Sequence, residues 1–453
     1  MIKFSRNFYF IIPTPFLINF FFNVNNLKHL NLSSLFLSLL CFIFIYLLGK
    51  EISSIFNIDS ISLAITYYFM GAFIINFVLL PVLGSFLNFK ETIFAYNICL
   101  IIILLVKSRN YQNIFILLIT LTVVRFILMN TDILNPSYIQ YNSDVTEFWL
   151  PMTEKIYDSN LFSATKNNII PGYSLMINFI YAELHFIFFS WDTFTFNQVI
   201  PNIFLYLNLL LMAELNLSNF AKTILVLTYL PIILNSDWLS YLFINSLMGE
   251  VVVNYVFSVF LVNAFQNKKN KDSKLYFFVL GFLYFLKPFS SFIFFIIPIY
   301  LFYKYKKTYI AYLPIFGFIV NNIYSRFLSL NIKNEDNFLS ENFYLQILYE
   351  NFNQLTNFNL TNIVLIFYDQ IFIDRVLTLF LCMYLFIFIF NKGNYKNFNI
   401  LNSAIVLNFF LVFYLYISIW KNIELGSAYR YLFSFLNIFF IDFAFKVNSQ
   451  ITK

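Results

Sequence analysis

The sequence predicts an all-α fold, a polytopic transmembrane helical bundle of about 11–14 spans with interfacial helices in an external loop. Three observations lead to this prediction. Of the 453 residues, 60% are hydrophobic and only 11% are charged, whereas soluble domains carry about 25% charged residues. Apolar runs long enough to cross a hydrocarbon core of about 30 Å recur along the chain. Lys and Arg gather in a few of the short polar breaks, as they do in cytoplasmic loops.

The apolar runs divide the chain into three regions. Residues 1–130 are predicted to form N-terminal transmembrane helices, residues 131–168 an acidic external loop, and residues 169–453 a transmembrane core with a late external segment at 326–361. No small-residue cleavage pattern follows the first, proline-broken run, so we expect no cleavable signal peptide. The predicted spans lie at residues 8–23, 33–49, 62–86, 92–106, 112–129, 170–190, 197–217, 220–235, 240–264, 275–288, 289–303, 308–325, 363–391, 400–420 and 428–446.

Clusters of basic residues in short loops predict which ends of the spans face the cytoplasm. Successive crossings then place residues 131–168, 326–361 and 421–427 outside and the C-terminus, with Lys446 and Lys453, inside. The clusters that orient the chain are Lys107 with Arg109, then Lys268, Lys269, Lys271 and Lys274, then Lys304, Lys306 and Lys307, then Lys392 and Lys396.

The number of runs between residues 168 and 265 sets a constraint on this topology. Four apolar runs separate an external loop from a cytoplasmic one, and an odd number of crossings is needed. One run should therefore not span. The run at 220–235, which contains Lys222 and Pro231, is the candidate.

Several classes of site are not predicted. Cys41, Cys99 and Cys382 lie in apolar runs and His29 and His185 are the only histidines, so we expect no disulfide framework, no metal site and no cofactor. We interpret His185 as a packed residue of an apolar run. The net charge of +6 is spread over loops, which does not favour nucleic-acid binding. The sequence has no Walker loop, HExxH, GxSxG or dinucleotide motif.

The external stretch "YNSDVTEFWLPMTEKIYDSNLF", from Tyr141 to Phe162, concentrates carboxylates in an otherwise apolar chain. Asp144 and Glu147 are three residues apart, so both would lie on one face of a helix. The following mixture of charged and apolar residues, with Trp149 among the aromatics, predicts an interfacial amphipathic helix on the outer membrane surface. The alternative is a solvated amphipathic loop without chemistry.

Further ionisable residues stand at the predicted outer ends of spans, where a charge is costly and is a functional hypothesis by default. Lys287, in "GFLYFLKPFSSF", is predicted at the outer turn of a helical hairpin, where it could bind a lipid phosphate or reach the interface by snorkelling. Arg430, flanked by Tyr429 and Tyr431, could bind a phosphate or anchor its helix. Glu250 begins a span that leads to a cytoplasmic Lys cluster.

Taken in order, these elements make the chain resemble the GT-C class of multi-spanning glycosyltransferases, which includes protein mannosyltransferases and lipid A aminoarabinose transferases. The resemblance is that of a distant branch with extra N-terminal spans, and it covers residues 140–446. The features that carry it are Asp144 with Glu147, "IIPGYSLMINFIY" from Ile169, "FLKP" at Phe285 to Pro288, "YRYLF" at Tyr429 to Phe433, and Glu250 at the start of a middle span.

The resemblance implies a multi-pass protein of the bacterial inner membrane whose active site faces outside. The donor would be a polyprenyl-phosphate sugar, and the acceptor a hydroxyl of a lipid, glycan or protein. Asp144 would be the catalytic base, with Glu147 as its neighbour or substitute. Lys287 and Arg430 would hold the lipid phosphate, and Glu250, Trp149 and Tyr429 would contribute to substrate binding.

Three alternatives remain open at the level of sequence. An O-antigen-type polymerase or ligase would also act on polyprenyl-linked glycans, although the late external segment contains only Arg326 instead of paired arginines. A transporter or flippase would need no covalent chemistry. A structural or scaffold role is the third.

Overall fold

The structure, a computed structural model, describes residues 32–83, 87–107, 111–130, 149–160, 175–188, 196–235, 249–266, 274–286 and 436–451. All regular elements in these ranges are helices, in agreement with the all-α prediction, and no strand occurs in them. They are α3 (Leu32–Phe56), α4 (Ile61–Leu83), α5 (Phe89–Lys107), α6 (Tyr111–Asn130), α7 (Leu150–Asp158), α9 (Leu175–Phe188), α10 (Phe196–Glu214), α11 (Asn219–Asn235), α13 (Glu250–Gln266), α14 (Lys274–Gly281), the 3₁₀-helix η6 (Phe282–Phe285) and α22 (Leu436–Ile451).

Three of the described helices are long and apolar enough to cross a membrane. These stretches are Ser34–Phe56 in α3, Phe89–Lys107 in α5 and Tyr111–Leu128 in α6. Other described helices are apolar but shorter, among them α9 with 14 residues. At a rise of 1.5 Å per residue, the described part of α9 is about 21 Å long.

The sequence predicts one span at 275–288, but the described part of this run is not a single continuous α-helix. Its described part begins as α14 and tightens into η6 directly after Gly281. Glycine weakens a helix interior because it has the most backbone freedom to lose. Short 3₁₀ segments are common at such helix ends.

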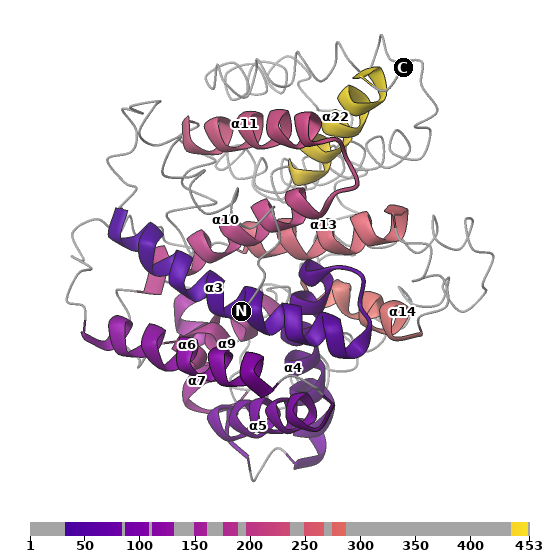
Figure 1. The fold of residues 1–453 in the computed structure, drawn as a ribbon. Coiled ribbons are helices and arrows are strands. Elements are labelled where there is room, and N and C mark those ends of the chain that lie inside the picture. The colour runs from indigo at the N-terminus through magenta and orange to yellow at the C-terminus, as the bar shows by residue number, and fades with distance from the viewer. Residues whose placement is uncertain are drawn as a thin grey trace, which may run out of the picture.

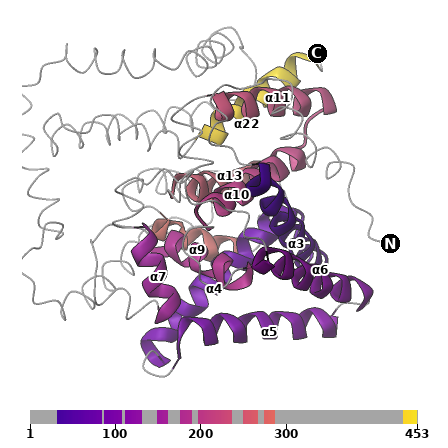
Figure 2. The same cartoon turned by 90° about the vertical axis from the view of Figure 1, so that its left-hand side faces the viewer.

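The helices form a layered arrangement in which segments far apart in the sequence lie side by side (Figure 1). The pair α11 and α22 lies at the top of the view, α3, α10 and α13 cross the middle, and α4, α5, α6, α7 and α9 lie below. The side view shows α5 running along the base with α7 at one of its ends (Figure 2). The described C-terminal helix α22 therefore packs on α11 and α13, and α7 packs on α5 and α9.

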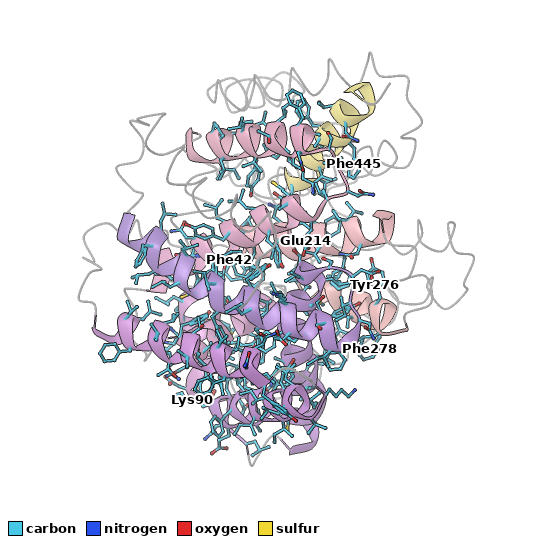
Figure 3. All side chains as sticks on the ribbon, viewed as in Figure 1. Phe42, Lys90, Glu214, Tyr276, Phe278 and Phe445 are labelled. Carbon is cyan, nitrogen blue, oxygen red and sulfur yellow. The ribbon has the colours of Figure 1, made fainter. Side chains whose placement is uncertain are left out.

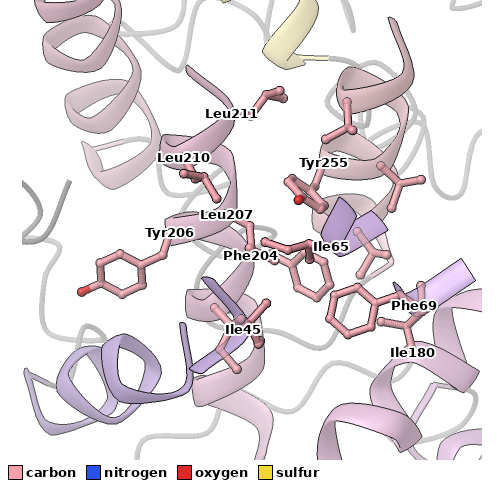
Figure 4. Close-up of a cluster of buried hydrophobic side chains, with 14 of the residues drawn as sticks. Ile45, Ile65, Phe69, Ile180, Phe204, Tyr206, Leu207, Leu210, Leu211 and Tyr255 are labelled. Atoms are coloured by element: carbon pink, nitrogen blue, oxygen red, sulfur yellow. The ribbon is translucent and has the colours of Figure 1, made fainter. Parts of the chain in front are cut away.

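The centre of the described part is an apolar cluster contributed by α3, α4, α9, α10 and α13 (Figure 4). Phe204 of α10 lies between Phe69 of α4, at 6.5 Å between ring centroids, and Tyr255 of α13, at 5.8 Å. The Tyr255 hydroxyl donates a hydrogen bond to the carbonyl of Ser62 at 3.1 Å. Buried tyrosines usually find such a partner, so these aromatic residues both fill the interior and fix the register of the helices.

The start of α4 depends on a carboxylate from another helix. Asn57, with φ of 52°, ends α3 in the left-handed conformation that Asn tolerates, and the chain turns toward α4. Glu214, the last residue of α10, accepts hydrogen bonds from the hydroxyl of Ser60 at 2.7 Å and from the N–H of Ile61 at 2.8 Å. Glu214 lies within the packed side chains of the middle layer (Figure 3). It thereby satisfies backbone donors that the first turn of a helix leaves open, with favourable charge at the positive end of the dipole.

The hairpin of α5 and α6 has the opposite character from α3. In α3, 78% of the apolar stretch is buried, whereas in α5 and α6 only 17% is buried. The side chains that α5 and α6 expose include Phe94, Ile102, Phe115, Val123 and Phe126. Contiguous apolar surfaces of this extent mark contact with a membrane or another protein.

Lys446 of α22 is not a free cytoplasmic anchor charge. Its Nζ lies 2.6 Å from Oδ2 of Asp442, one turn earlier, and both side chains are buried. A charge taken out of water is retained only when it is paired and hydrogen-bonded. The pair lies on the helix that packs against α11, where Phe440 makes an edge-to-face contact with Tyr229 at 5.2 Å.

We predict that Glu214→Ala lowers the stability of the protein by about 1–3 kcal/mol, because it removes the acceptor for donors at the start of α4. The measurement is the thermal unfolding midpoint of the purified protein in detergent. Glu91→Ala is the matched control, because Glu91 also accepts a hydrogen bond near a helix start, from the N–H of Asn88 at 3.1 Å, but at an exposed position. Equal shifts for the two variants would contradict the role of Glu214.

Candidate functional site

The helix α7 directly follows the acidic segment that the sequence singles out. The sequence predicts an amphipathic helix here, and the structure confirms it, with Pro151 in the first turn where its missing N–H does no harm. Its buried side carries Thr153, Ile156 and Tyr157. This side packs against α5 and α9. A nine-residue helix is too short to be stable alone, so packing on its neighbours holds it.

The C-terminal end of α7 is tied to the start of α5. The N–H of Phe89 donates to the carbonyl of Ser159 at 2.7 Å, which joins the two backbones directly. Nζ of Lys90 lies 3.3 Å from Oδ1 of Asp158 and 4.2 Å from the centre of the Tyr157 ring. Lys90 is at the lower edge of the described part (Figure 3). The ion pair is exposed and contributes little, whereas the backbone bond and the buried ring fix the geometry.

Tyr157 also shows the local electrostatics of this end of α7. Partial burial raises the pKa of its hydroxyl above the usual value, and the neighbouring carboxylate of Asp158 raises this pKa further. The positive charge of Arg125 on α6 lowers the pKa of the same hydroxyl. The ring packs edge-on against His185 of α9, with 5.1 Å between centroids.

The start of α7 meets the start of α13. A β-carbon added at Gly249 would lie 3.0 Å from Cη2 of Trp149 and 2.5 Å from Cδ1 of Ile177, so the indole packs directly on this glycine. Gly249 immediately precedes Glu250, the first residue of α13. The structure thus brings together Trp149 and Glu250, which are predicted site residues from distant parts of the sequence.

Glu250 is fully buried at the N-terminal end of α13, where a helix favours negative charge. It acts electrostatically on Tyr181 of α9. One turn further along α13, Oδ1 of Asn254 accepts the N–H of Asn437 at 3.0 Å. Nδ2 of Asn437 donates to Oδ1 of Asn208 at 2.6 Å, so α10, α13 and α22 meet beside this acid.

The other predicted site residues lie outside the described residues. These are Asp144, Glu147, Lys287, Tyr429 and Arg430. In sequence they flank described segments that carry contacts. Glu147 precedes Trp149 by two residues, Lys287 follows the buried Leu286, and Tyr429 and Arg430 precede α22.

A second acid, which was not predicted from the sequence, lies inside the described helices. Glu183 of α9 is fully buried, next to the hydroxyls of Tyr68 on α4 and Tyr96 on α5. The signal that could have found it is simple, because Glu183 is an ionisable residue inside the apolar run 170–190. Its neighbour His185 is also fully buried, and its ring contact with Tyr157 confirms that it is packed.

The described helices do not gather the residues that a metal ion would need. No group of three or more His, Cys, Asp or Glu side chains in these ranges could hold one. Comparisons with known protein families, curated proteins and solved structures gave no match.

We predict that Gly249→Ala destabilises the protein by about 1–3 kcal/mol, because the added methyl group overpacks the contact with Trp149 and Ile177. Ile177→Val removes the Cδ1 atom that lies closest, so the cost of Gly249→Ala should be smaller in that background. Thermal unfolding of the four proteins of this double-mutant cycle gives both values. Fluorescence of a variant whose only tryptophan is Trp149 should shift to the red with Gly249→Ala. An unchanged spectrum and an additive cycle would argue against the contact.

Proposed function

We propose that this protein is an integral membrane glycosyltransferase of the GT-C type, located in the bacterial inner membrane. It transfers a sugar from a polyprenyl-phosphate donor to a hydroxyl of a lipid, glycan or protein on the outer side. The observation that carries the proposal is the convergence of Trp149 and Glu250 at the joined starts of α7 and α13. Hydropathy alone would not bring these two residues together.

The membrane part of the proposal is a polytopic helical bundle of about 11–14 spans. It is supported by three described helices that are long and apolar enough to span, and by the exposed apolar side chains of α5 and α6. In this topology the N-terminal end of α5 and the C-terminal end of α6 face outside. Phe89 of α5 and Arg125 of α6 both interact with α7, which supports placing α7 at this outer end.

The proposed chemistry is a single displacement at the anomeric carbon. The acceptor oxygen forms a bond to that carbon while the bond to the phosphate oxygen breaks, and the polyprenyl phosphate leaves with the electron pair. Asp144 takes the proton of the acceptor hydroxyl, and Glu147 is its neighbour or substitute. Lys287 and Arg430 stabilise the negative charge that develops on the departing phosphate. The anomeric configuration inverts because the two bonds lie on opposite faces.

Trp149, Tyr429 and Glu250 have a binding role in this proposal. An indole offers a rigid apolar face for a sugar ring or a polyprenyl chain. The Trp149 ring is buried against Gly249, so its position is fixed by packing before any substrate arrives. A fixed Trp149 next to the acidic segment in the sequence would support catalysis, because reacting groups must be held in the productive geometry.

We predict that Asp144→Asn leaves the protein folded in the membrane but reduces sugar transfer by at least about 100-fold, the low end of what general acid–base catalysis contributes. The measurement is release of polyprenyl phosphate from a panel of synthetic polyprenyl-phosphate hexoses in membranes that contain the protein. Glu154→Gln is the matched control, because Glu154 is a partly exposed carboxylate of the neighbouring helix α7 and has no role in the proposed transfer. Full activity of Asp144→Asn would refute the base assignment, and absence of turnover by the wild type with every donor would count against the proposed function.

We predict that Cys99, which is exposed on α5, does not react with a membrane-impermeant maleimide in intact membranes. The exposed side chains around it are apolar, and the proposed topology buries them in lipid. The test uses a variant in which Cys99 is the only cysteine, and labelling should appear once the membrane is dissolved in a denaturing detergent. Glu91→Cys in a cysteine-free chain is the control, because it stands in the first turn of the same helix and should label in open vesicles. Labelling of Cys99 at the rate of the control would contradict the lipid-facing assignment.

A further inference from the structure

We propose that Glu183 of α9 is a proton-binding site in the apolar interior, and that the bound proton decides whether Tyr68 of α4 donates its hydroxyl proton to Asn97 of α5 or to Glu183 of α9. In the proton-bound state the carboxylic acid donates its O–H to the Tyr68 hydroxyl oxygen. This inference is independent of the proposed transferase activity, because it uses none of the residues assigned to that site.

The burial of Glu183 is the first observation. The side chain is fully buried, as are Ala182 and Leu184 on either side of it in the chain. Neither of its carboxyl oxygens accepts a hydrogen bond from a donor in the described part of the chain. An ionised carboxylate has about four acceptor sites, and leaving them empty in an apolar interior is strongly unfavourable.

The hydroxyl of Tyr68 lies against this carboxyl group but has already used its proton. It donates to Oδ1 of Asn97 at 2.7 Å. The orientation of the Asn97 amide is fixed, because its Nδ2 donates to the carbonyl of Ile93 at 3.0 Å. A hydroxyl has a single proton, so Tyr68 can offer Glu183 only an acceptor lone pair.

Tyr96, the other hydroxyl near Glu183, is committed in the same way. It donates to the main-chain carbonyl of Tyr68 at 3.0 Å, and a carbonyl can only accept. Gly71 leaves room for this arrangement, since a β-carbon there would lie 3.1 Å from the Tyr96 hydroxyl oxygen. Both tyrosine hydroxyls therefore offer Glu183 only acceptor lone pairs. An ionised carboxylate also only accepts, so a hydrogen bond between Glu183 and either hydroxyl requires a proton on the carboxyl group.

Other titratable groups of the described elements packed around α9 have different surroundings. Tyr157 of α7 lies against His185, and Arg125 of α6 acts on Tyr157. His185 is two residues from Glu183, and at about 100° per residue the two side chains point to nearly opposite sides of α9. Tyr206 of α10 donates to the carbonyl of Leu35, Glu214 caps α4, and Glu250 of α13 acts on Tyr181. The ring of Tyr67 of α4 packs on Phe260, and Asp158 of α7 pairs with Lys90 of α5. Glu154 and Lys155 of α7 are partly exposed.

Loss of the proton from Glu183 changes which group accepts the hydrogen bond of the Tyr68 hydroxyl. A carboxylate at Glu183 requires a donor, and the Tyr68 hydroxyl can supply its proton only by releasing Asn97. The proton-bound state thus keeps the hydrogen bond that Tyr68 donates to α5, whereas the proton-free state loses this bond and reverses the direction of the hydrogen bond between Tyr68 and Glu183. Two discrete arrangements of one buried hydroxyl are the kind of element that a ligand can bias.

The test is infrared spectroscopy of the full chain in detergent, comparing the wild type with Glu183→Gln. The carbonyl stretch of a carboxylic acid is separated from the bands of a carboxylate. We expect an acid band at neutral pH in the wild type that is absent in Glu183→Gln. Glu91→Gln, an exposed carboxylate of α5, should leave the acid band unchanged.

A second variant keeps the test decisive if Glu183→Gln fails to fold. Tyr68→Phe retains the acid and removes its acceptor, so the acid band should persist and move to higher frequency. An acid band whose frequency is the same in Tyr68→Phe as in the wild type would overturn the assigned hydrogen bond.

Two results would overturn the proton assignment itself. One is a difference spectrum between wild type and Glu183→Gln that contains carboxylate bands alone at neutral pH. The other is an acid band that appears only when choline replaces Na⁺, because this would make the oxygen-lined site a metal-cation site instead.

Discussion

The structure depends on one constraint, which is that polar groups in an apolar interior must find partners within the protein. Lipid offers no hydrogen bonds, so the described helices supply them to one another. Asn202 of α10 donates to the hydroxyl of Ser34 on α3 at 3.2 Å, and Asn437 of α22 donates to Asn208 of α10 at 2.6 Å. Glu214 serves α4 in the same way. These contacts set which helices are neighbours and at which register, while the surrounding apolar residues fill the space.

The same constraint explains why α7 is held by protein. Its backbone is joined to α5 through Phe89 and Ser159, and Thr153 lies 3.4 Å from Oδ1 of Asn178 on α9. Tyr157 and the preceding Trp149 are buried. A short helix anchored in this way has a fixed position, which is a physical advantage for the proposed site, whose acids precede this helix in the sequence.

Helix α9 connects the two polar neighbourhoods of the described part. One side of it carries Asn178 and His185 toward α7, and Glu183 lies next to α4 and α5. A rearrangement of Tyr68 that follows the proton of Glu183 would therefore act on the helix that supports α7. Energetic coupling between sites requires an element with two arrangements that both sites can bias. Helix α9 contacts α7 through Asn178 and His185 and lies next to Tyr68 at Glu183, so it connects the two neighbourhoods.

The sequence by itself determined the all-helical class, the apolar runs and the helix after the acidic segment, because hydrophobicity and its periodicity are local properties of the chain. It also marked Glu250 and Trp149, since charged and aromatic residues are conspicuous in such a composition. Only the tertiary structure decided that Trp149 packs on Gly249, that one side of α7 packs against α5 and α9, and that Tyr68 and Tyr96 present acceptors to Glu183. These facts depend on the crossing of helices distant in sequence, and periodicity along one helix carries no information about its partner.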